Sequence, residues 1–240
     1  MAAFESQLTG REEVAEGTMA FHFAKPAGLD YKAGQSMNVG LIDPPETDAK
    51  GNRRNFSIVS APFEGELVIA TRMRDTAFKR VLKTTPMGTK VHLRGPGGML
   101  VLHGNASRPA VFLAGGIGIT PFVSMLRQAA HDRLPHKLFL FYSNRRPEDA
   151  AFLDELIELQ RRNPSYRFVG TMTEMEKSSR PWKGETGFVD RAMLERHVDD
   201  LAGAIYYMAG PPAMVEAMQK MLEGAGVKSE AILSDEFYGY

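Results

Sequence analysis

The sequence predicts two domains, an antiparallel β-barrel followed by an α/β domain built on a doubly wound parallel sheet. Up to about residue 103, short strand-like runs alternate with Gly and Pro turns, which is typical of antiparallel barrels and sandwiches. After residues 104–108 the pattern changes to apolar strands separated by helices, as in a doubly wound sheet. A chain of 240 residues is long enough for two domains of ordinary size. We therefore expect domains at residues 1–104 and 105–240.

The first domain is expected to contain five short strands and one helix. The candidate strands are residues 18–23, 35–42, 55–60, 66–73 and 90–93. The helix is predicted because Phe78, Val81 and Leu82 recur at helical spacing. Asp75 or Thr76 precedes them and can serve as the N-cap.

The second domain is expected to alternate strands with helices. Its candidate strands are the apolar runs 111–114, 138–142, 166–172 and 204–208. Thr120 and Pro121 suit the N-cap and the first residue of one helix. Residues 147–149 open a second helix, and residues 211–212 open a third.

A glycine-rich turn, residues 115–121, connects the first of these strands to its helix. Glycines allow a phosphate group to approach the backbone, and the N–H groups of the first helical turn can bind it. The alternative is a close-packed turn that binds no ligand, since Pro121 stands where the usual dinucleotide fingerprint has its third glycine. The turns after the other strands favour a nucleotide site, because ligands bind beyond the carboxyl ends of parallel strands. These turns are residues 143–145, 171–174 and 209–212.

The first domain contains a second candidate site, residues 53–57, in an extended conformation. Residues two apart on a strand share a face, so Arg54 lies with Phe56 and Asn55 lies with Ser57. A cation, an aromatic ring and a hydroxyl so close together can hold a phosphate and a flat heterocycle. The alternative is that Phe56 is a core residue and that residues 53–54 are a solvated pair of arginines.

The composition excludes several classes of function. Because it has no cysteine, the sequence cannot form disulfides, thiolate-ligated iron–sulfur clusters or cysteine nucleophiles, and we expect no metal site. The formal net charge is zero, so nucleic acid and anionic membranes are poor default partners. No apolar run approaches the roughly 20 residues of a membrane span, and the N-terminus lacks the pattern of a signal peptide. We therefore expect a cytoplasmic protein.

Six short motifs are distributed over nearly the whole chain. They are Arg54-Asn55-Phe56-Ser57, Thr76-Ala77-Phe78, Gly95-Pro96-Gly97-Gly98, the turn from Gly115 to Pro121, Ala209-Gly210-Pro211-Pro212, and the terminal run from Asp235 to Tyr240. This ordered set resembles the ferredoxin–NADP reductases and their relatives. The resemblance implies an FAD-binding barrel and an NAD(P)-binding domain, with the two reactive rings meeting in the cleft between them.

The resemblance also implies roles for individual residues. Arg54 would clamp the FAD phosphates, Phe56 would cover one face of the isoalloxazine ring, and Ser57 would lie near the flavin nitrogen that accepts hydride. Residues 116–121 would cradle the pyridine nucleotide, with Thr120 near the nicotinamide. The expected catalytic residues are Ser57, Thr120 and Glu236, and the cofactor-binding set is completed by Asn55, Thr76, Ala77, Gly116, Gly118, Pro121, Arg145, Thr173, Gly210, Pro211 and Tyr240.

The C-terminus is similar to the family end that supplies an acid and an aromatic ring to the flavin, but its register is open. Asp235 with Phe237, or Glu236 with Tyr238, fits this pattern, and Tyr240 could also reach the ring.

The sequence also departs from the family pattern at two positions. Phe56 stands where the family usually has tyrosine, so stacking is kept while a hydrogen bond is lost. Ala209 replaces a cysteine that many members place beside the nicotinamide, so we expect slower or differently tuned hydride transfer.

The choice between NADH and NADPH depends on charge near the 2′-phosphate. NADPH-specific relatives often have a serine and an arginine where this sequence has Thr173 and Glu174. A carboxylate there would repel the phosphate and could bind a free ribose diol, which favours NADH. Arg145 and Arg146 could bind the phosphate instead.

The resemblance implies a flavoenzyme that takes hydride from NAD(P)H onto FAD and passes electrons to a separate acceptor. This acceptor would be a ferredoxin, a flavodoxin, an oxygenase component or a small molecule. One alternative is a reductase of free flavin or quinone. Another is a dinucleotide sensor without turnover, which the alanine at position 209 leaves open.

Overall fold

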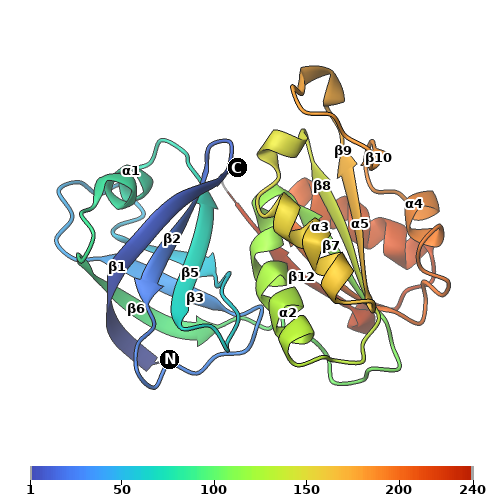
Figure 1. The fold of residues 1–240 in the computed structure, drawn as a ribbon, viewed down its shortest axis with the longest axis horizontal. Helices are drawn as coiled ribbons and strands as arrows, with labels where there is room; N and C mark the ends of the chain where they lie inside the picture. The colour runs from blue at the N-terminus through green and yellow to red at the C-terminus, as the bar shows by residue number, and fades with distance from the viewer. Residues whose placement is uncertain (1, 239–240) are drawn as a thin grey trace.

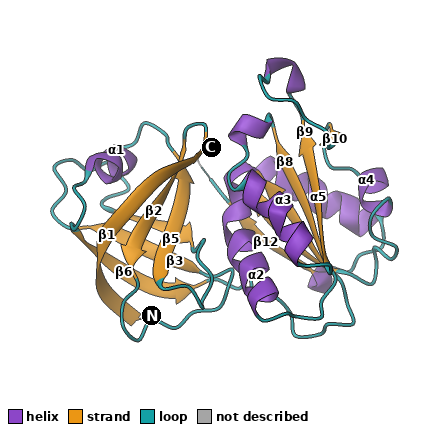
Figure 2. Cartoon of the chain, viewed as in Figure 1, coloured by secondary structure: helices purple, strands orange, loops and turns teal. Residues whose placement is uncertain are grey.

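The computed structural model describes residues 2–238 and confirms the predicted pair of architectures. An antiparallel six-stranded sheet lies beside a parallel six-stranded sheet flanked by helices (Figure 1). Helices are concentrated around the parallel sheet, whereas the antiparallel part has the single α-helix α1 among its described residues (Figure 2). No helix in the described part of the chain is long and apolar enough to cross a membrane.

The antiparallel sheet has the strand order β4-β3-β6-β1-β2-β5. Its elements are β1 (Ala2–Ala15), β2 (Thr18–Ala24), β3 (Ser36–Leu41), β4 (Arg53–Ser57), β5 (Glu66–Arg72), α1 (Ala77–Thr84) and β6 (Lys90–Gly97). The two edges approach one another at an isolated bridge between Ile58 and Ile69, and the Val59 N–H donates to the Val68 carbonyl at 2.8 Å. The sheet is therefore barrel-like, although no continuous ladder closes it.

The longest strand, β1, is missing from the sequence-based prediction. Of its residues only Ser6 and Leu8 are buried, so the apolar alternation that signals a strand is almost absent. Its conformation comes from pairing on both sides, with β2 and with β6. Long-range backbone hydrogen bonds therefore stabilise this strand, in the absence of a local sequence pattern that would predict it.

The parallel sheet has the order β10-β9-β8-β7-β11-β12. Its strands are β7 (Ala110–Gly115), β8 (Leu138–Asn144), β9 (Tyr166–Met172), β10 (Glu185–Thr186), β11 (Ile205–Gly210) and β12 (Ile232–Glu236), and its helices are α2 (Thr120–His131), α3 (Leu153–Arg162), α4 (Arg191–Glu195) and α5 (Pro212–Gly224). Short 3₁₀ turns are η1 (Gly116–Ile119), η2 (Pro147–Asp149), η3 (Met175–Lys177) and η4 (Ser229–Ala231). The sequence analysis did not predict β10, β12 or α4. Residues 98–109 connect β6 to β7, and the domain boundary that we place between residues 104 and 105 lies within this connection.

The central strand β7 is buried on both faces, as its unbroken apolar run indicates. Phe112 belongs to the cluster that includes residues of α2 and α3, whereas Val111 and Leu113 belong to the cluster that includes residues of α4 and α5. The helices therefore cover both faces of the sheet, which leaves the carboxyl ends of its strands as the place for ligands.

Two predicted helix starts are wrong. Thr120 is not an N-cap, because η1 coils the chain directly after β7 and Thr120 already has helical angles (φ −54°, ψ −47°). The predicted helix opening at residues 147–149 is the separate turn η2, and α3 begins only after Phe152, whose φ is 60°. In α1, by contrast, Thr76 is the N-cap, and its side chain accepts from the Lys79 N–H.

The two parts of the chain meet through α2 and through η2. On the α2 side, the apolar cluster of α2 and α3 also contains residues of the antiparallel part: Ala20, Val59, Val68 and Ala70. Here Ser124 Oγ donates to the Ser60 carbonyl at 2.7 Å. On the η2 side, the contacts are ion pairs, Arg72 with Asp149 and Glu16 with Arg146.

Candidate functional site

A cleft of about 540 Å³ is lined by residues from both parts of the chain. It contains seven of the residues selected from the sequence: Arg54, Asn55, Phe56, Ser57, Thr76, Thr120 and Glu236. They come from β4, the start of α1, the start of α2 and the end of β12. The fold therefore brings residues more than 170 positions apart, such as Arg54 and Glu236, to one cavity.

Arg54 and Phe56 share one face of β4, as predicted. Both contact Phe78 of α1: the Arg54 guanidinium lies 5.2 Å from its ring centroid, and the Phe56 ring lies 5.8 Å away at a tilt of 36°. Phe56 is only partly buried and lines the cleft, so it is not simply a core residue. A cation and an aromatic wall therefore lie side by side in the cavity.

The guanidinium of Arg54 is held in place by the loop before β4. Asp48 accepts from its Nη2 through both carboxylate oxygens, at 2.6 and 2.8 Å. Its Nη1 donates to the carbonyls of Lys50, Gly51 and Arg53. The hydrogen bond from Arg54 lowers the pKa of Asp48. The sequence analysis selected no residue of this loop, so it missed Asp48.

Further cations line the same cleft, and the sequence analysis selected none of them: Lys50, Arg72, Arg74 and Lys79. Lys79 Nζ donates to the Arg72 carbonyl at 2.7 Å. Burial and the nearby charges of Arg74 and Arg54 lower the pKa of Lys79 to about 8. A positively charged cavity beside an aromatic wall fits a pyrophosphate joined to a flat ring. Arg72 and Arg74, at the end of the predicted strand 66–73, are the sequence signal that could have indicated this positively charged cavity.

Ser57 and Thr120 face the cleft from opposite parts of the fold, and both are almost completely buried. Ser57 ends β4 opposite Ser36 of β3. The Thr120 hydroxyl donates to the Ile117 carbonyl at 3.0 Å. The two side chains therefore have fixed places at the junction of the two sheets.

The glycine turn after β7 packs tightly against the turn after β11. A Cβ on Gly118 would lie 2.1 Å from the Ala209 carbonyl oxygen, and one on Gly210 would lie 3.1 Å from Gly115 Cα. These glycines are required by backbone packing. Gly116 differs, because its φ is +54° and no atom lies within 4 Å of a Cβ built there. The packed-turn interpretation thus explains part of this motif without a ligand.

Strand β12 places the C-terminal residues in the cleft, because it pairs with β11 so that Asp235 lies opposite Ala209. Burial raises the pKa of Asp235. Glu236 is exposed and accepts a hydrogen bond from the Tyr238 hydroxyl. The Phe237 N–H donates to the Gly210 carbonyl at 3.0 Å, and its ring packs against the core.

Tyr238 is 77% exposed, whereas Phe237 is partly buried. The contrast favours the first of the two registers, with Asp235 as the acid and Phe237 as the aromatic ring. Tyr240, also selected from the sequence, lies outside the described residues.

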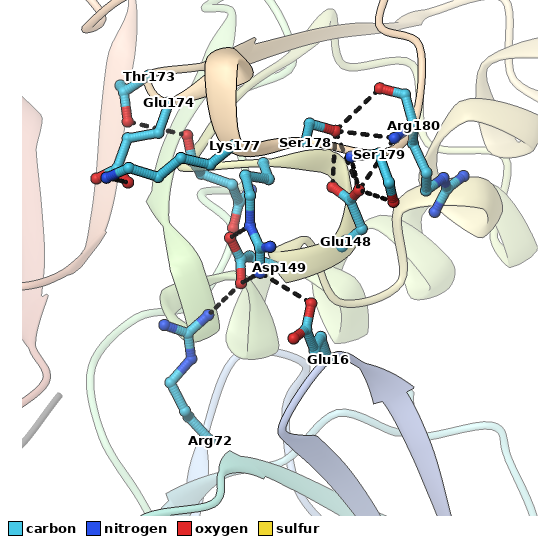
Figure 3. Close-up of polar contacts among 12 residues, drawn as sticks. Glu16, Arg72, Glu148, Asp149, Thr173, Glu174, Lys177, Ser178, Ser179 and Arg180 are labelled. Carbon is cyan, nitrogen blue, oxygen red and sulfur yellow. Dashed lines mark hydrogen bonds and ion pairs between the residues drawn. The ribbon is translucent and has the colours of Figure 1, made fainter.

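The turns after β8 and β9 lie next to each other, and their residues Arg145, Thr173 and Glu174 do not line the cleft. The Thr173 N–H donates to the Asn144 carbonyl, and the Glu174 N–H donates to the Arg145 carbonyl at 2.8 Å. Glu174 accepts from Lys177 Nζ at 2.7 Å, which lowers the pKa of Glu174 (Figure 3). The carboxylate that was expected to repel a 2′-phosphate is thus itself paired with a cation.

Comparison with known proteins agrees with this arrangement. The family model of the oxidoreductase NAD-binding domain matches residues 112–220, which covers most of the parallel sheet. Solved structures with the same fold include an FAD/NAD-binding domain of a nitric oxide dioxygenase and a ferredoxin NADP+ reductase with bound FAD and NADP. Residues 112–220 therefore match the oxidoreductase NAD-binding domain, and the chain has the fold of the ferredoxin–NADP reductase-like structures.

The chain is similar to the reductase component of propane 2-monooxygenase from Rhodococcus jostii, with 29% identity over 97% of the chain and 63% of the relative. The chain thus spans less than two thirds of that protein's length. The FAD/NAD-binding domain of a Vibrio cholerae nitric oxide dioxygenase has a TM-score of 0.84, 19% identity and coverage of 97% and 98%. A Neisseria gonorrhoeae ferredoxin NADP+ reductase with bound FAD and NADP has a TM-score of 0.80, 22% identity and coverage of 98% of both chains.

Proposed function

We propose that this protein is an FAD-dependent reductase that takes hydride from NAD(P)H and passes electrons to a separate acceptor. The observation that carries the proposal is the single cleft lined from both sheets, with cations and an aromatic wall on one side and the carboxyl edge of the parallel sheet on the other. Hydride transfer requires two rings held face to face, and a cleft between two binding parts supplies that geometry.

FAD, when bound, supplies the ring that accepts hydride and can release electrons one at a time. Arg54 and Lys79 are proposed to bind its phosphates, supported by their positive charge and their places in the cleft. Phe56 is proposed to cover one ring face, and Ser57 is proposed to donate to the reacting edge. On the other side, residues 116–121 and 210–211 would hold the dinucleotide, with Thr120 near the nicotinamide.

Asp235 is proposed as the group that holds a proton beside the flavin, in place of Glu236. Both carboxylates line the cleft, but Asp235 is half-buried and burial raises its pKa. Such a carboxyl keeps its proton to a higher pH than an exposed one, which suits a proton donor. Glu236 is exposed and already paired with Tyr238.

The electron acceptor is proposed to be an oxygenase component. This proposal is supported by the relatives named as the reductase component of propane 2-monooxygenase and the electron transfer component of toluate 1,2-dioxygenase. The 240 residues supply no cysteine for an iron–sulfur centre of their own. One-electron carriage beyond the flavin would therefore depend on a centre outside these 240 residues.

NADH is proposed as the preferred donor, by a modest margin. Glu174 is ionised at neutral pH, since its pKa is lowered, and a negative charge repels a 2′-phosphate. Lys177 offsets part of that charge, and Arg145 lies on the adjoining turn. Glu174→Gln is expected to lower the ratio of kcat/KM for NADH to that for NADPH.

Anaerobic stopped-flow reduction with NADH and NADPH in parallel tests the proposed function. We expect the purified protein to bind about one FAD per chain and its yellow colour to bleach on mixing. A free-flavin reductase would lack bound FAD, and a sensor would bind NADH without bleaching. A colourless protein that takes up no added FAD contradicts the whole proposal.

Arg54→Ala tests the phosphate clamp. A charge-assisted hydrogen bond to phosphate is worth about 1.5–3 kcal/mol, so the Kd for FAD should rise by about ten- to a hundredfold. Arg53→Ala is the matched control, because the neighbouring guanidinium does not line the cleft. Equal FAD affinity in the two variants would contradict the assignment of Arg54.

A further inference from the structure

The turn η2 is a junction between three segments that are distant in sequence (Figure 3). Its backbone is tied to the antiparallel part, because the Glu16 N–H donates to the Glu148 carbonyl at 2.9 Å. Arg146, the residue before η2, donates through Nε and Nη2 to the two carboxylate oxygens of Asp149, at 3.0 Å each. The same guanidinium donates to Glu16 at 2.8 Å. The turn is thus fixed to the β1–β2 connection by both backbone and side-chain contacts.

The Asp149 carboxylate also contacts a residue that lines the proposed flavin cleft. Its oxygen lies 3.8 Å from Nη2 of Arg72, and the two side chains are only 13% and 19% exposed. Arg72 ends β5 and lines the cleft. The Met73 N–H donates to the Gly17 carbonyl at 2.7 Å, which joins the end of β5 to the β1–β2 turn. Asp149 therefore contacts a rigid rim of the flavin-side cavity.

The Glu148 carboxylate points the other way, toward the segment after β9. It accepts from Ser178 Oγ, from the N–H and Oγ of Ser179 and from the Arg180 N–H, at 2.7–3.0 Å. Burial alone would raise the pKa of Glu148, but hydrogen bonds including those from Ser178 and Ser179 outweigh it and lower the pKa to about 2. The carboxylate stays ionised and holds this loop through four donor groups on three consecutive residues.

We propose that η2 is a strut between the two cofactor sites, in which Asp149 is a positioning residue for hydride transfer and Glu148 is a positioning residue for nucleotide binding. The inference rests on the proposed function. Asp149 fixes the carboxyl edge of the parallel sheet relative to the flavin cleft, whereas Glu148 shapes the loop beside residues 173–177. Neither side chain lines the cleft, so each acts through the groups that it holds.

The apolar contact through α2 explains why such a strut is needed. Burial of apolar surface is strong but non-directional, so directional contacts have to set the rotation between the two parts. On the α2 side these are the Ser124–Ser60 hydrogen bond and the Arg127–Glu64 ion pair. Ion pairs and hydrogen bonds at a second, separate point depend on direction. Two separate points of contact fix the angle at which the two rings would meet.

Asp149→Asn tests the first half of the proposal, because it removes the charge and keeps the size of the side chain. We expect unchanged FAD content, an NADH Kd within about twofold, and a limiting rate of flavin reduction lower by at least about tenfold, since misplacement by about 1 Å can cost a hundredfold. Raising KCl from about 0.05 M to about 0.5 M should slow the wild type more than the variant, because salt screens ion pairs and the variant keeps only the Glu16–Arg146 pair. Asp149→Glu should recover part of the rate.

Glu148→Gln tests the second half and should show the opposite pattern. We expect the Kd for NADH to rise by about three- to tenfold, while the limiting rate of flavin reduction stays within about twofold of the wild type, because the loop loosens and the flavin side is untouched. Glu158→Gln is the matched control for both variants. It removes a carboxylate that pairs with Arg161 on the surface of α3, away from η2, and should change neither quantity.

Glu16→Gln keeps the proposal testable if Asp149 variants fold poorly. Glu16 is largely exposed, so the variant should fold, and its loss of the Arg146 pair should lower the limiting rate by about two- to fivefold. Wild-type limiting rates in both Asp149→Asn and Glu16→Gln would overturn the strut. If the wild type itself bound no FAD or were not reduced by NADH, the proposed function would fail instead, and these two results are distinct.

Discussion

The two sides of the interface between the sheets are built from different interactions. On the α2 side, Met125 is 1% exposed and packs against Gly34, and Ser124 donates to the Ser60 carbonyl. On the η2 side, the contacts are partly exposed ion pairs around Arg146. The α2 side is mainly apolar, although Arg127 Nη1 of α2 also lies 3.3 Å from a carboxylate oxygen of Glu64, whereas the η2 side consists of ion pairs and hydrogen bonds. The comparison shows how one interface can be both stable and oriented.

Met125→Ala should have the largest effect on stability. It removes a buried side chain at the apolar side, and such changes cost about 2–5 kcal/mol in the free energy of unfolding. Urea denaturation followed by circular dichroism measures it. Met99→Ala, at a side chain that is 86% exposed, is the control and should change stability by less than about 0.5 kcal/mol. Equal effects would show that α2 does not carry the interface.

Ser124→Ala should have a smaller effect, about 0.5–1.5 kcal/mol, because the Ser60 carbonyl keeps a second donor. That donor is the Tyr31 hydroxyl, at 3.1 Å. Tyr31→Phe alone should cost a similar amount. The double variant should cost more than the sum, since it leaves a buried carbonyl without either partner. Strict additivity in a double-mutant cycle would contradict this account of the hydrogen bonds.

Asp149→Asn should change the free energy of unfolding by less than about 1 kcal/mol, because partly exposed ion pairs contribute little to stability. Thermal unfolding at low and high salt measures this effect. The same variant is expected to slow flavin reduction strongly, so stability and rate should separate. A loss of stability as large as that of Met125→Ala would erase the contrast between the two sides.

The smallest effect concerns pH. Hydrogen bonds lower the pKa of Glu148 to about 2 from an ordinary 4.5, so its ionised form stabilises the folded state. That contribution is complete above about pH 4.5 and is lost as the pH falls toward 2. The stability difference between the wild type and Glu148→Gln should therefore be constant above pH 5 and shrink toward pH 2, as measured by urea titration at each pH. A difference that grows on acidification would reverse the assigned sign.

Local sequence patterns correctly indicated the features that depend on neighbouring residues. The apolar run at 111–114 predicted a strand buried on both faces, and Thr76 was one of two candidate caps for α1. The alternation at residues 54–57 placed Arg54 and Phe56 on one face of β4. Each of these follows from local periodicity, which a chain carries whatever its distant contacts are.

Which distant groups meet depends on how the segments pack against one another. Strand β1 forms because it pairs with β2 and with β6. Asp48 and Lys79 line the cleft because the loop before β4 and the first turn of α1 both lie beside β4. The pairing of β12 with β11 favoured Asp235 over Glu236, and η2 became a junction because its partners come from residues 16, 72 and 178–180. A local sequence pattern predicts the secondary structure of one segment, whereas these contacts depend on the packing of several segments. No local pattern therefore predicted them.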